Sequence, residues 1–314
     1  MEKTALITGS AGYLGSQLSK DLYRAGYTVI GFDQKLPTHK YNHIFYPGDI
    51  RDRTRVNDVL ARHKYDLVIH CASRIEVGES MKDPTEFHEV NVGGTAILLN
   101  AMKKNKVPKI LFSSTAAVYW AGNAPLVESE CTTPDNSVYG STKIACERMI
   151  EESGIKYGIF RYFNLAGADP EGDIGENHEP ETHLIPSIFR NLNTFRVYGD
   201  DYDTDDGTCI RDYVHVSDVS SAHLLAIDHL DDNDSFTVNL GTGKGYSILQ
   251  IIQLIEYTLG LKVNYTIAER RAGDPDRLVA DVTLAKKLLT YRPKHDILSI
   301  IKTAYEWEKR NGRE

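Results

Sequence analysis

A glycine-rich segment near the start of the chain constrains the fold more than any other part of the sequence. It runs Thr8-Gly9-Ser10-Ala11-Gly12-Tyr13-Leu14-Gly15, between a β-branched run at 4–8 and helical periodicity at 13–25. Glycines at this spacing permit a tight turn, close approach of the backbone to a pyrophosphate, and close packing of the helix on the strand. The N–H groups of the helix N-terminus would then face the phosphates. The segment therefore predicts a strand–turn–helix unit that binds a dinucleotide.

The rest of the first half alternates short β-branched runs with stretches of helical periodicity. Strands are expected at 28–33, 66–71, 109–113 and 157–162, and helices at 54–63, 85–104 and 137–153. Strands separated by helices of this length favour a parallel sheet covered on both faces. The sequence therefore predicts an α/β, doubly wound parallel-sheet Rossmann fold.

The composition of the sequence and the expected order of elements change after Asn164. Long acidic, glycine-rich loops are expected at 168–182 and 199–207, helices at 216–230, 248–259, 282–289 and 298–309, and strands at 235–240 and 262–267. We therefore expect a first domain over residues 1–165, to which the chain returns in part around 209–245. A smaller mixed α/β domain is expected over residues 166–314.

The charge balance and the cysteines exclude several classes of protein. The chain carries 36 Lys and Arg against 44 Asp and Glu, for a formal net charge of −8, so no nucleic-acid partner is expected. Its apolar runs are too short for a signal peptide or a membrane span, so no membrane partner is expected. Cys71, Cys131, Cys146 and Cys209 show no C-x-x-C pair and no metal-ligand spacing. Reduced thiols in a cytoplasmic protein without a bound metal are therefore expected.

Two acidic residues bear on the kind of dinucleotide. Asp33 ends the second expected strand, where its carboxylate can accept hydrogen bonds from the adenosine ribose and would repel a 2′-phosphate. We therefore expect NAD rather than NADP. Asp49, which precedes Ile50, is interpreted equally well as an adenine contact or as an acid at a helix N-terminus.

A tyrosine and a lysine predict the reacting groups. Tyr139 and Lys143 are four residues apart, which places a phenol and an ammonium on one face of a predicted helix. This helix follows the strand at 109–113, and ligands of doubly wound sheets bind beyond the carboxyl ends of the strands. A free phenol titrates near 10, but a neighbouring ammonium and a positive nicotinamide ring lower that pKa. Tyr139 is the expected acid/base, with Ser114 or Thr115 hydrogen-bonding the reacting hydroxyl.

These motifs resemble those of the extended short-chain dehydrogenases/reductases, which share T-G-x-x-G-x-x-G, the Ser/Thr and Y-x-x-x-K. Over nearly the whole chain, the sequence is similar to the UDP-glucose 4-epimerases within that family. The segments that carry this narrower similarity are 77–80, 91–95, 161–164, 199–216, 239–243 and 270–274. The resemblance implies an NAD-dependent isomerase that interconverts UDP-glucose and UDP-galactose through a transient 4-keto intermediate. The first domain would bind NAD, and the second mainly the nucleotide sugar.

The resemblance also implies two sets of site residues. The cofactor set is Gly9, Gly12, Tyr13, Leu14, Gly15, Asp33, Gln34, Asp49, Ile50, Ala72, Asn91, Ser113, Tyr139, Lys143 and Tyr162. The substrate set is Thr115, Asn164, His183, Leu184, Tyr198, Arg211, Arg271, Asp274 and Leu278. Lys143 would bind the nicotinamide ribose, Tyr162 would lie near the nicotinamide, and Tyr198 would lie against the uracil.

The diphosphate has its own implied partners. Asn164, Arg211 and Arg271 would bind it, since two cations suit two phosphate charges. His183, just before Leu184, falls in the segment that caps it.

Three positions depart from the family pattern. Ile75 stands where many epimerases have a lysine, so one cation on the cofactor side is missing. Gln34 replaces a frequent asparagine. Leu278 occupies the position that controls the space around the C2 substituent of the hexose, so UDP-N-acetylglucosamine or another UDP-sugar stays open as the substrate.

Other enzymes of the same fold fit less well. Ala116, after Thr115, provides neither the acid of the dehydratases and decarboxylases nor the cysteine of the 3,5-epimerase/reductases. A more distant alternative is a non-catalytic NAD-sensing protein, which would have no reason to keep Tyr139, Lys143 and Thr115 together.

The family also implies a homodimer formed by the helices expected at 85–104 and 137–153. From the residues alone, the apolar stripe of Ile97, Leu98, Ala101 and Met102 is explained equally well as an internal core stripe.

Overall fold

The computed structural model describes residues 3–119, 125–130, 132, 137–271 and 274–312. Cys131, together with Ala272 and Gly273 of the motif at 270–274, lies outside the described residues. The chain forms two compact units. Unit 1 comprises Met1–Trp120, Cys131–Arg161 and Ser220–Val238, and unit 2 comprises Ala121–Glu130, Tyr162–Val219 and Asn239–Glu314.

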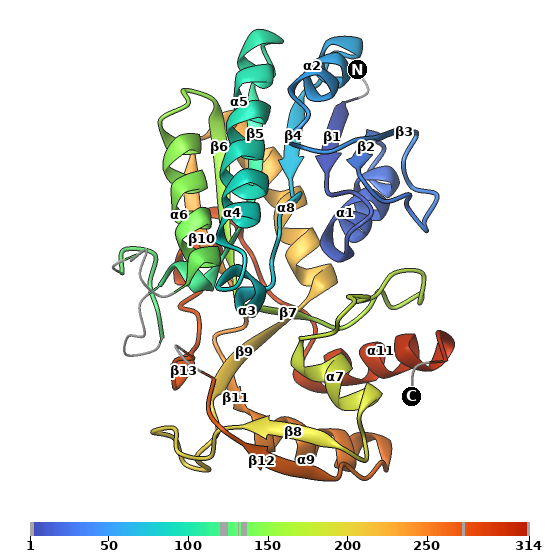
Figure 1. Ribbon diagram of the computed structural model, residues 1–314. Coiled ribbons are helices and arrows are strands. Elements are labelled where there is room, and N and C mark those ends of the chain that lie inside the picture. The colour runs from blue at the N-terminus through green and yellow to red at the C-terminus, as the bar shows by residue number, and fades with distance from the viewer. Residues whose placement is uncertain (1–2, 120–124, 131, 133–136, 272–273, 313–314) are drawn as a thin grey trace. The chain divides into compact units, whose positions relative to one another are not determined.

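Unit 1 is built on a seven-stranded sheet with the order β10-β6-β5-β4-β1-β2-β3 (Figure 1). Its strands are β1 (Thr4–Thr8), β2 (Thr28–Asp33), β3 (Ile44–Pro47), β4 (Leu67–His70), β5 (Lys109–Thr115), β6 (Lys156–Tyr162) and β10 (Phe236–Leu240). The pairs β1–β2, β1–β4, β2–β3 and β4–β5 are parallel. From β1 the order runs one way to β2 and β3 and the other way to β4 and β5, which confirms the predicted doubly wound Rossmann fold.

The helices of unit 1 follow the predicted periodicity, with one interruption. They are α1 (Tyr13–Arg24), α2 (Arg53–Arg62), α3 (Val77–Ser80), α4 (Pro84–Phe87), the π-helical η1 (His88–Gly93), α5 (Gly94–Lys104), the 3-10 turn η2 (Ala116–Val118), α6 (Val138–Glu151) and α8 (Val216–Asp232). The single helix expected at 85–104 is therefore α4, a π-helical turn and α5. Such turns are often found at functional sites, and this one contains Asn91.

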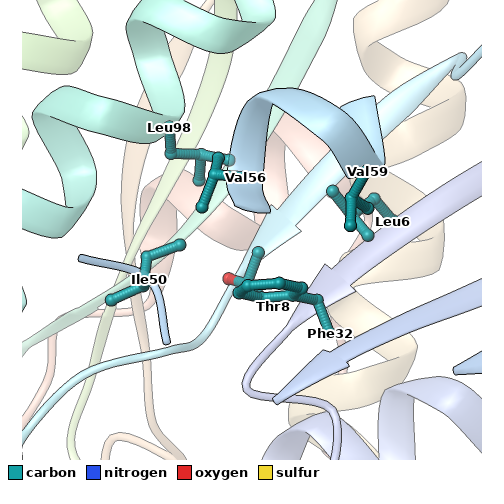
Figure 2. A pocket seen from close by; sticks show the side chains of 7 residues that line it. All are labelled: Leu6, Thr8, Phe32, Ile50, Val56, Val59 and Leu98. Atoms are coloured by element: carbon teal, nitrogen blue, oxygen red, sulfur yellow. The ribbon is translucent and has the colours of Figure 1, made fainter. Parts of the chain in front are cut away.

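The apolar stripe on α5 belongs to the core of unit 1. Leu98, Ala101 and Met102 are fully buried there, and Ile97 packs against the same core. The stripe is therefore internal core, so the implied dimer contact gains no support from it. Figure 2 shows a hollow within this core, lined by Leu6, Thr8, Phe32, Ile50, Val56, Val59 and Leu98.

Unit 2 combines small sheets with helices. Its strands are β7 (Asn164–Ala166), β8 (Phe195–Tyr198), β9 (Ile210–His215), β11 (Gly245–Ser247), β12 (Tyr265–Ala268) and β13 (Arg277–Leu278), and its helices are α7 (Leu184–Arg190), α9 (Ile248–Leu259), α10 (Thr283–Leu289) and α11 (Ile297–Arg310). β9 pairs with β7 and β13 in parallel and with β11 in antiparallel, while β12 and β8 form a separate parallel pair.

Several of these elements are absent from the sequence-based prediction. β9 is the clearest case, because its buried residues include Arg211 and Asp212, which are 8% and 0% exposed. Charged residues at buried positions break the apolar pattern by which a strand is predicted from sequence. Their burial depends on partners that lie far away in the sequence. Within the described ranges, no helix has both the length and the hydropathy that crossing a bilayer requires.

Candidate active site

The glycine turn forms as its spacing predicts. Gly9 has a φ of +75°, and a Cβ built on it would lie 2.7 Å from the backbone nitrogen of Ala72 on the segment after β4. A Cβ on Gly15 would lie 2.0 Å from the carbonyl oxygen of Gly9, so α1 packs directly on the turn. Gly12 is the N-cap of α1 and supplies no side-chain oxygen. The first turn of α1, which includes Tyr13 and Leu14, is therefore suited to an external anion.

Asp33 lies beside this turn. One carboxylate oxygen accepts from the Ala11 N–H at 3.0 Å, and the other accepts from the Lys35 N–H at 2.9 Å. A carboxylate offers about four lone-pair sites, so these two bonds leave capacity for a ribose diol. Gln34, the next residue, is exposed.

Asp49 binds an arginine of its own loop. The Arg51 guanidinium donates to its carboxylate at 2.7 Å and pairs with Glu86 at 2.9 Å. The hydrogen bond from Arg51 holds the pKa of Asp49 below its usual value. The N-cap of α2 is Asp52, whose side chain accepts from the Arg55 N–H. Asp49 is therefore not the capping acid of that helix.

Asn91 is a buried bridge between two elements. Its Nδ2 donates to Thr142 Oγ1 on α6 at 3.0 Å and to the Arg74 carbonyl at 3.1 Å, and its Oδ1 accepts from the Arg74 N–H at 2.8 Å. These bonds fix the segment after β4, which contains Ala72 and Ile75, relative to α6. Asn91 is therefore a positioning residue.

Tyr139, Lys143, Thr115 and Ser113 lie together at the end of β5. Thr115 lies close enough to the Tyr139 hydroxyl to lower its pKa, but burial outweighs this effect and raises the pKa of Tyr139 to about 12. Lys143 Nζ donates to the Ser113 carbonyl at 2.8 Å and lies 5.8 Å from the centroid of the Tyr139 ring. Burial lowers the pKa of Lys143 to about 8, so its ammonium still predominates at neutral pH.

The start of α6 is held by residues that the sequence analysis did not single out. Ser137 Oγ accepts from the Gly140 N–H at 3.0 Å, and the Tyr139 N–H donates to Ser80 Oγ at 3.1 Å. A Cβ on Gly140 would lie 2.4 Å from the Ala117 carbonyl oxygen. Only glycine lets α6 approach the backbone after Thr115 this closely. The available signal was the cap pattern S-x-x-G around Tyr139.

A buried ion pair anchors the same helix further along. Arg161 Nη2 lies 2.7 Å from Glu147, and their side chains are 8% and 5% exposed. Ser114 Oγ also donates to Glu147. Ser114 is thus engaged with Glu147, while Thr115 contacts Tyr139, so Thr115 is the better placed of the two candidate hydroxyls.

In unit 2, β9 and β13 bring part of the substrate set together. The guanidinium of Arg211 on β9 forms an ion pair with Asp274. Leu278 on β13 pairs with Arg211 in the register of the sheet. The guanidinium of Arg271 lies over the ring of Tyr198, 4.3 Å from its centroid.

One residue of each predicted set lies near the start of unit 2. Tyr162 is buried, and Asn164 begins β7, opposite Tyr213 of β9. Asp212, beside Arg211, accepts four hydrogen bonds from Thr242, Gly243 and Ala280, and so anchors the turn at 241–243.

His183 is the N-cap of α7, directly before Leu184. Its Nδ1 lies 2.8 Å from Glu176 Oε1 and 3.4 Å from Glu181 Oε1. His183 therefore belongs to a cluster of histidines and glutamates that the sequence analysis missed. The signal for it was the dense run E-x-H-x-x-E-x-H at 176–183.

Comparison with known proteins gives one consistent result. A UDP-glucose 4-epimerase of Halalkalibacterium halodurans is 43% identical over 97% of this chain and 95% of the relative. A UDP-glucose 4-epimerase of Rhizobium meliloti is 42% identical over 98% of each chain. A crystal structure of UDP-glucose-4-epimerase from Stenotrophomonas maltophila, with bound NAD and formylated UDP-arabinopyranose, has a TM-score of 0.94 at 35% identity and covers 99% of both chains.

Residues 5–241 match the profile of the NAD dependent epimerase/dehydratase family. This match and the relatives above confirm the resemblance inferred from the glycine turn, the Tyr139–Lys143 pair and the later motifs. The chain belongs to the NAD dependent epimerase/dehydratase family.

Proposed function

We propose that this protein is an NAD-dependent UDP-hexose 4-epimerase that interconverts UDP-glucose and UDP-galactose. The observation that carries the proposal is the buried contact of Tyr139 with Thr115, with the Lys143 ammonium 5.8 Å from the Tyr139 ring centroid. These groups lie at the carboxyl end of β5, where a doubly wound sheet binds its ligands. The relatives and the crystal structure compared above bear the same enzyme name.

The residues present fit NAD. Gly9 and Gly15 bring the backbone so close that a side chain at either position would clash. Asp33 keeps acceptor capacity at the end of β2, where it would repel the 2′-phosphate of NADP. When bound, NAD would supply the hydride acceptor for C4 in its oxidised form and the hydride donor for the opposite face of the sugar in its reduced form.

Tyr139 performs the proton transfer. Its phenolate removes the proton of the C4 hydroxyl and gives a proton back after the 4-keto sugar has turned over. A pKa of about 12 is too high for this task, because a base works best when its pKa lies near the operating pH. A bound nicotinamide would add a positive charge near the phenol, which favours the phenolate and would lower that pKa. Thr115 hydrogen-bonds the C4 hydroxyl of the sugar and keeps this hydroxyl aligned with Tyr139.

The substrate set of unit 2 would hold the nucleotide. Arg211 and Arg271 supply two cations for the two phosphate charges, with Asn164 as a polar partner. Asp274, the ion-pair partner of Arg211, keeps that guanidinium oriented. Tyr198 would lie against the uracil, and Leu278 would border the hexose.

The first experiment tests the acid/base assignment. Tyr139→Phe removes only the hydroxyl, so we expect UDP-galactose turnover to fall by about 100-fold or more, with UDP binding unchanged by calorimetry. Tyr257→Phe is the matched control, because Tyr257 is 86% exposed, and it should behave as the parent. Full turnover in Tyr139→Phe would contradict the assignment. A parent protein that binds NAD but turns over no UDP-sugar would instead support the NAD-sensing alternative.

A second experiment tests the substrate. UDP-galactose, UDP-N-acetylgalactosamine and UDP-arabinose are assayed in parallel at matched concentrations. The proposal expects the highest kcat/KM for UDP-galactose. Higher kcat/KM for the N-acetylated sugar would favour the UDP-N-acetylglucosamine 4-epimerase alternative, which the moderate size of Leu278 leaves open.

We also propose a cytoplasmic homodimer. The free thiols of Cys71, Cys146 and Cys209 suit a reducing compartment, and the family resemblance suggests the dimer. Light scattering after size exclusion measures the mass directly, and twice the chain mass of 35.2 kDa is expected.

A further inference from the structure

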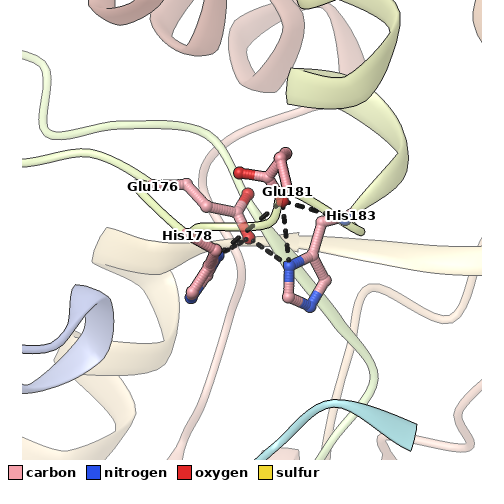
Figure 3. A group of neighbouring side chains, drawn as sticks. All are labelled: Glu176, His178, Glu181 and His183. Carbon is pink, nitrogen blue, oxygen red and sulfur yellow. Dashed lines mark hydrogen bonds and ion pairs between the residues drawn. The ribbon is translucent and has the colours of Figure 1, made fainter. Parts of the chain in front are cut away.

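The loop between β7 and α7 ends in a cluster of four side chains with metal-ligating atoms. Glu176, His178, Glu181 and His183 lie within one short run of the chain. Figure 3 shows these side chains converging on one another. One ligand atom from each of the four lies within 4.8 Å of the others.

The distances within the cluster match the ligand shell of a small ion. His183 Nδ1 lies 2.8 Å from Glu176 Oε1, and His178 Nδ1 lies 3.4 Å from the same oxygen. Glu181 Oε1 lies 3.4 Å from His183 Nδ1 and 3.7 Å from His178 Nδ1. Ligands placed tetrahedrally at zinc distances would be about 3.3 Å apart.

A second observation is that three of the four converging atoms make no hydrogen bond. Glu176 Oε1, His178 Nδ1 and His183 Nδ1 are buried and lack a hydrogen-bond partner within the described part of the chain, whereas Glu181 Oε1 accepts from the His183 N–H. Glu176 is only 4% exposed, so water cannot readily satisfy it. Burying such polar atoms without partners is costly. An ion bound at the centre of the cluster would explain why these nitrogen and oxygen atoms lie so close together without hydrogen-bond geometry.

We propose that Glu176, His178, Glu181 and His183 form a structural site for a divalent transition-metal ion, with Zn²⁺ as the best-suited ion. Two imidazole nitrogens and two carboxylates balance the charge of a divalent ion, and imidazole favours zinc and its neighbours over Mg²⁺ or Ca²⁺. Four protein ligands fill a tetrahedral shell, which is typical of structural rather than catalytic sites. The site departs from the expectation of a metal-free chain.

Contacts around the cluster hold its ligands in place. The His183 N–H donates to Glu181 Oε1 at 2.9 Å, and Arg190 Nη2 lies 3.4 Å from Glu181 Oε2. Arg190 is itself held at 2.9 Å by Glu308 of α11. Outer partners of this kind orient metal ligands and tune their affinity. The ion would thus link the long loop after β7 to the start of α7. The ion pair between Arg190 and Glu308 joins α7 to α11.

The test measures metal binding by the full chain. The purified protein is stripped with a chelator, reloaded with Zn²⁺, and analysed by mass spectrometry and by competition with a chromogenic chelator. We expect about one tightly held zinc per chain and a higher melting temperature after loading. Glu176→Gln and His178→Ala should each weaken zinc binding by more than about 100-fold, since loss of an outer partner alone costs about 10- to 100-fold.

Matched controls remove the same groups at exposed positions. Glu179→Gln alters the neighbouring carboxylate in the same loop, and His88→Ala removes an exposed imidazole, so both should bind zinc as the parent does. The proposal is overturned if the parent binds no stoichiometric zinc, if Glu176→Gln and His178→Ala bind normally, or if the controls lose binding equally. If a ligand variant fails to fold, the Co²⁺-loaded parent decides. An intense visible band from a tetrahedral site supports the proposal, and the weak band of six-coordinate cobalt overturns it.

Discussion

Replacing Gly140 by alanine tests how the fold places the reacting phenol. A Cβ at this position would lie 2.4 Å from the Ala117 carbonyl oxygen, whereas ordinary contact begins at 3.4 Å. The first turn of α6 must therefore move by about 1 Å, and it carries Tyr139. A misplacement of about 1 Å can lower kcat by about 100-fold.

The effect on stability should be much smaller. Overpacking costs about 1–3 kcal/mol, but alanine in a helix gains up to about 1 kcal/mol over glycine. The net loss expected from Gly140→Ala is therefore about 0–3 kcal/mol. Activity should fall far more than the folded fraction does.

Initial rates of UDP-galactose conversion, coupled to oxidation of the UDP-glucose product, measure kcat, and urea unfolding measures stability. Gly93→Ala is the matched control, because its Cβ would meet nothing closer than 3.8 Å, and it should keep the parent kcat. A folded Gly140→Ala variant whose kcat stays within about twofold of the parent would refute the claim that this close approach positions Tyr139.

Three further perturbations test the surroundings of the site. Arg161→Met leaves the Glu147 carboxylate buried without its partner, so urea unfolding should show a loss of about 3–5 kcal/mol, and Glu147→Leu in the same chain should recover much of it. Asp212→Asn turns an amide N–H₂ toward backbone donors such as the Gly243 N–H, so a loss of about 1–3 kcal/mol is expected, and a variant as stable as the parent would contradict the anchoring role. Burial lowers the pKa of His70 to about 3, so the unfolded chain binds more protons below about pH 6.5. The free energy of unfolding should therefore fall with acidification by up to about 1.4 kcal/mol per pH unit, and His70→Gln should lack this part of the slope.

The Rossmann sheet and the pairing of Tyr139 with Lys143 were predictable because their signals are local. The glycine turn directly follows a strand, Asp33 ends one, and Tyr139 and Lys143 share a helix face by spacing alone. Such patterns hold whatever the rest of the chain does. The late motifs that contain Arg211 and Arg271 pointed to the family by similarity rather than by geometry.

The sequence left several alternatives that the fold decides. It offered Ser114 and Thr115 equally as partners of the reacting hydroxyl, and only the burial of Glu147 beside Ser114 separates them. It offered Asp49 as a capping acid, whereas the structure caps α2 with Asp52. The first answer depends on a side chain that another element brings near, and the second on the residue at which α2 begins.

By itself, then, the sequence determined the doubly wound sheet, the glycine turn and the placement of Tyr139 and Lys143 on one helix face, because short-range spacing and periodicity encode each of them. Only the tertiary structure revealed the close approach at Gly140, the buried Glu147–Arg161 anchor and the convergence of Glu176, His178, Glu181 and His183. These features depend on burial and on the directions of side chains, which emerge only when separate elements pack together. The spacing of residues along the sequence predicts which of them share a helix face or a strand end. Packing decides which side chains from separate elements come into contact.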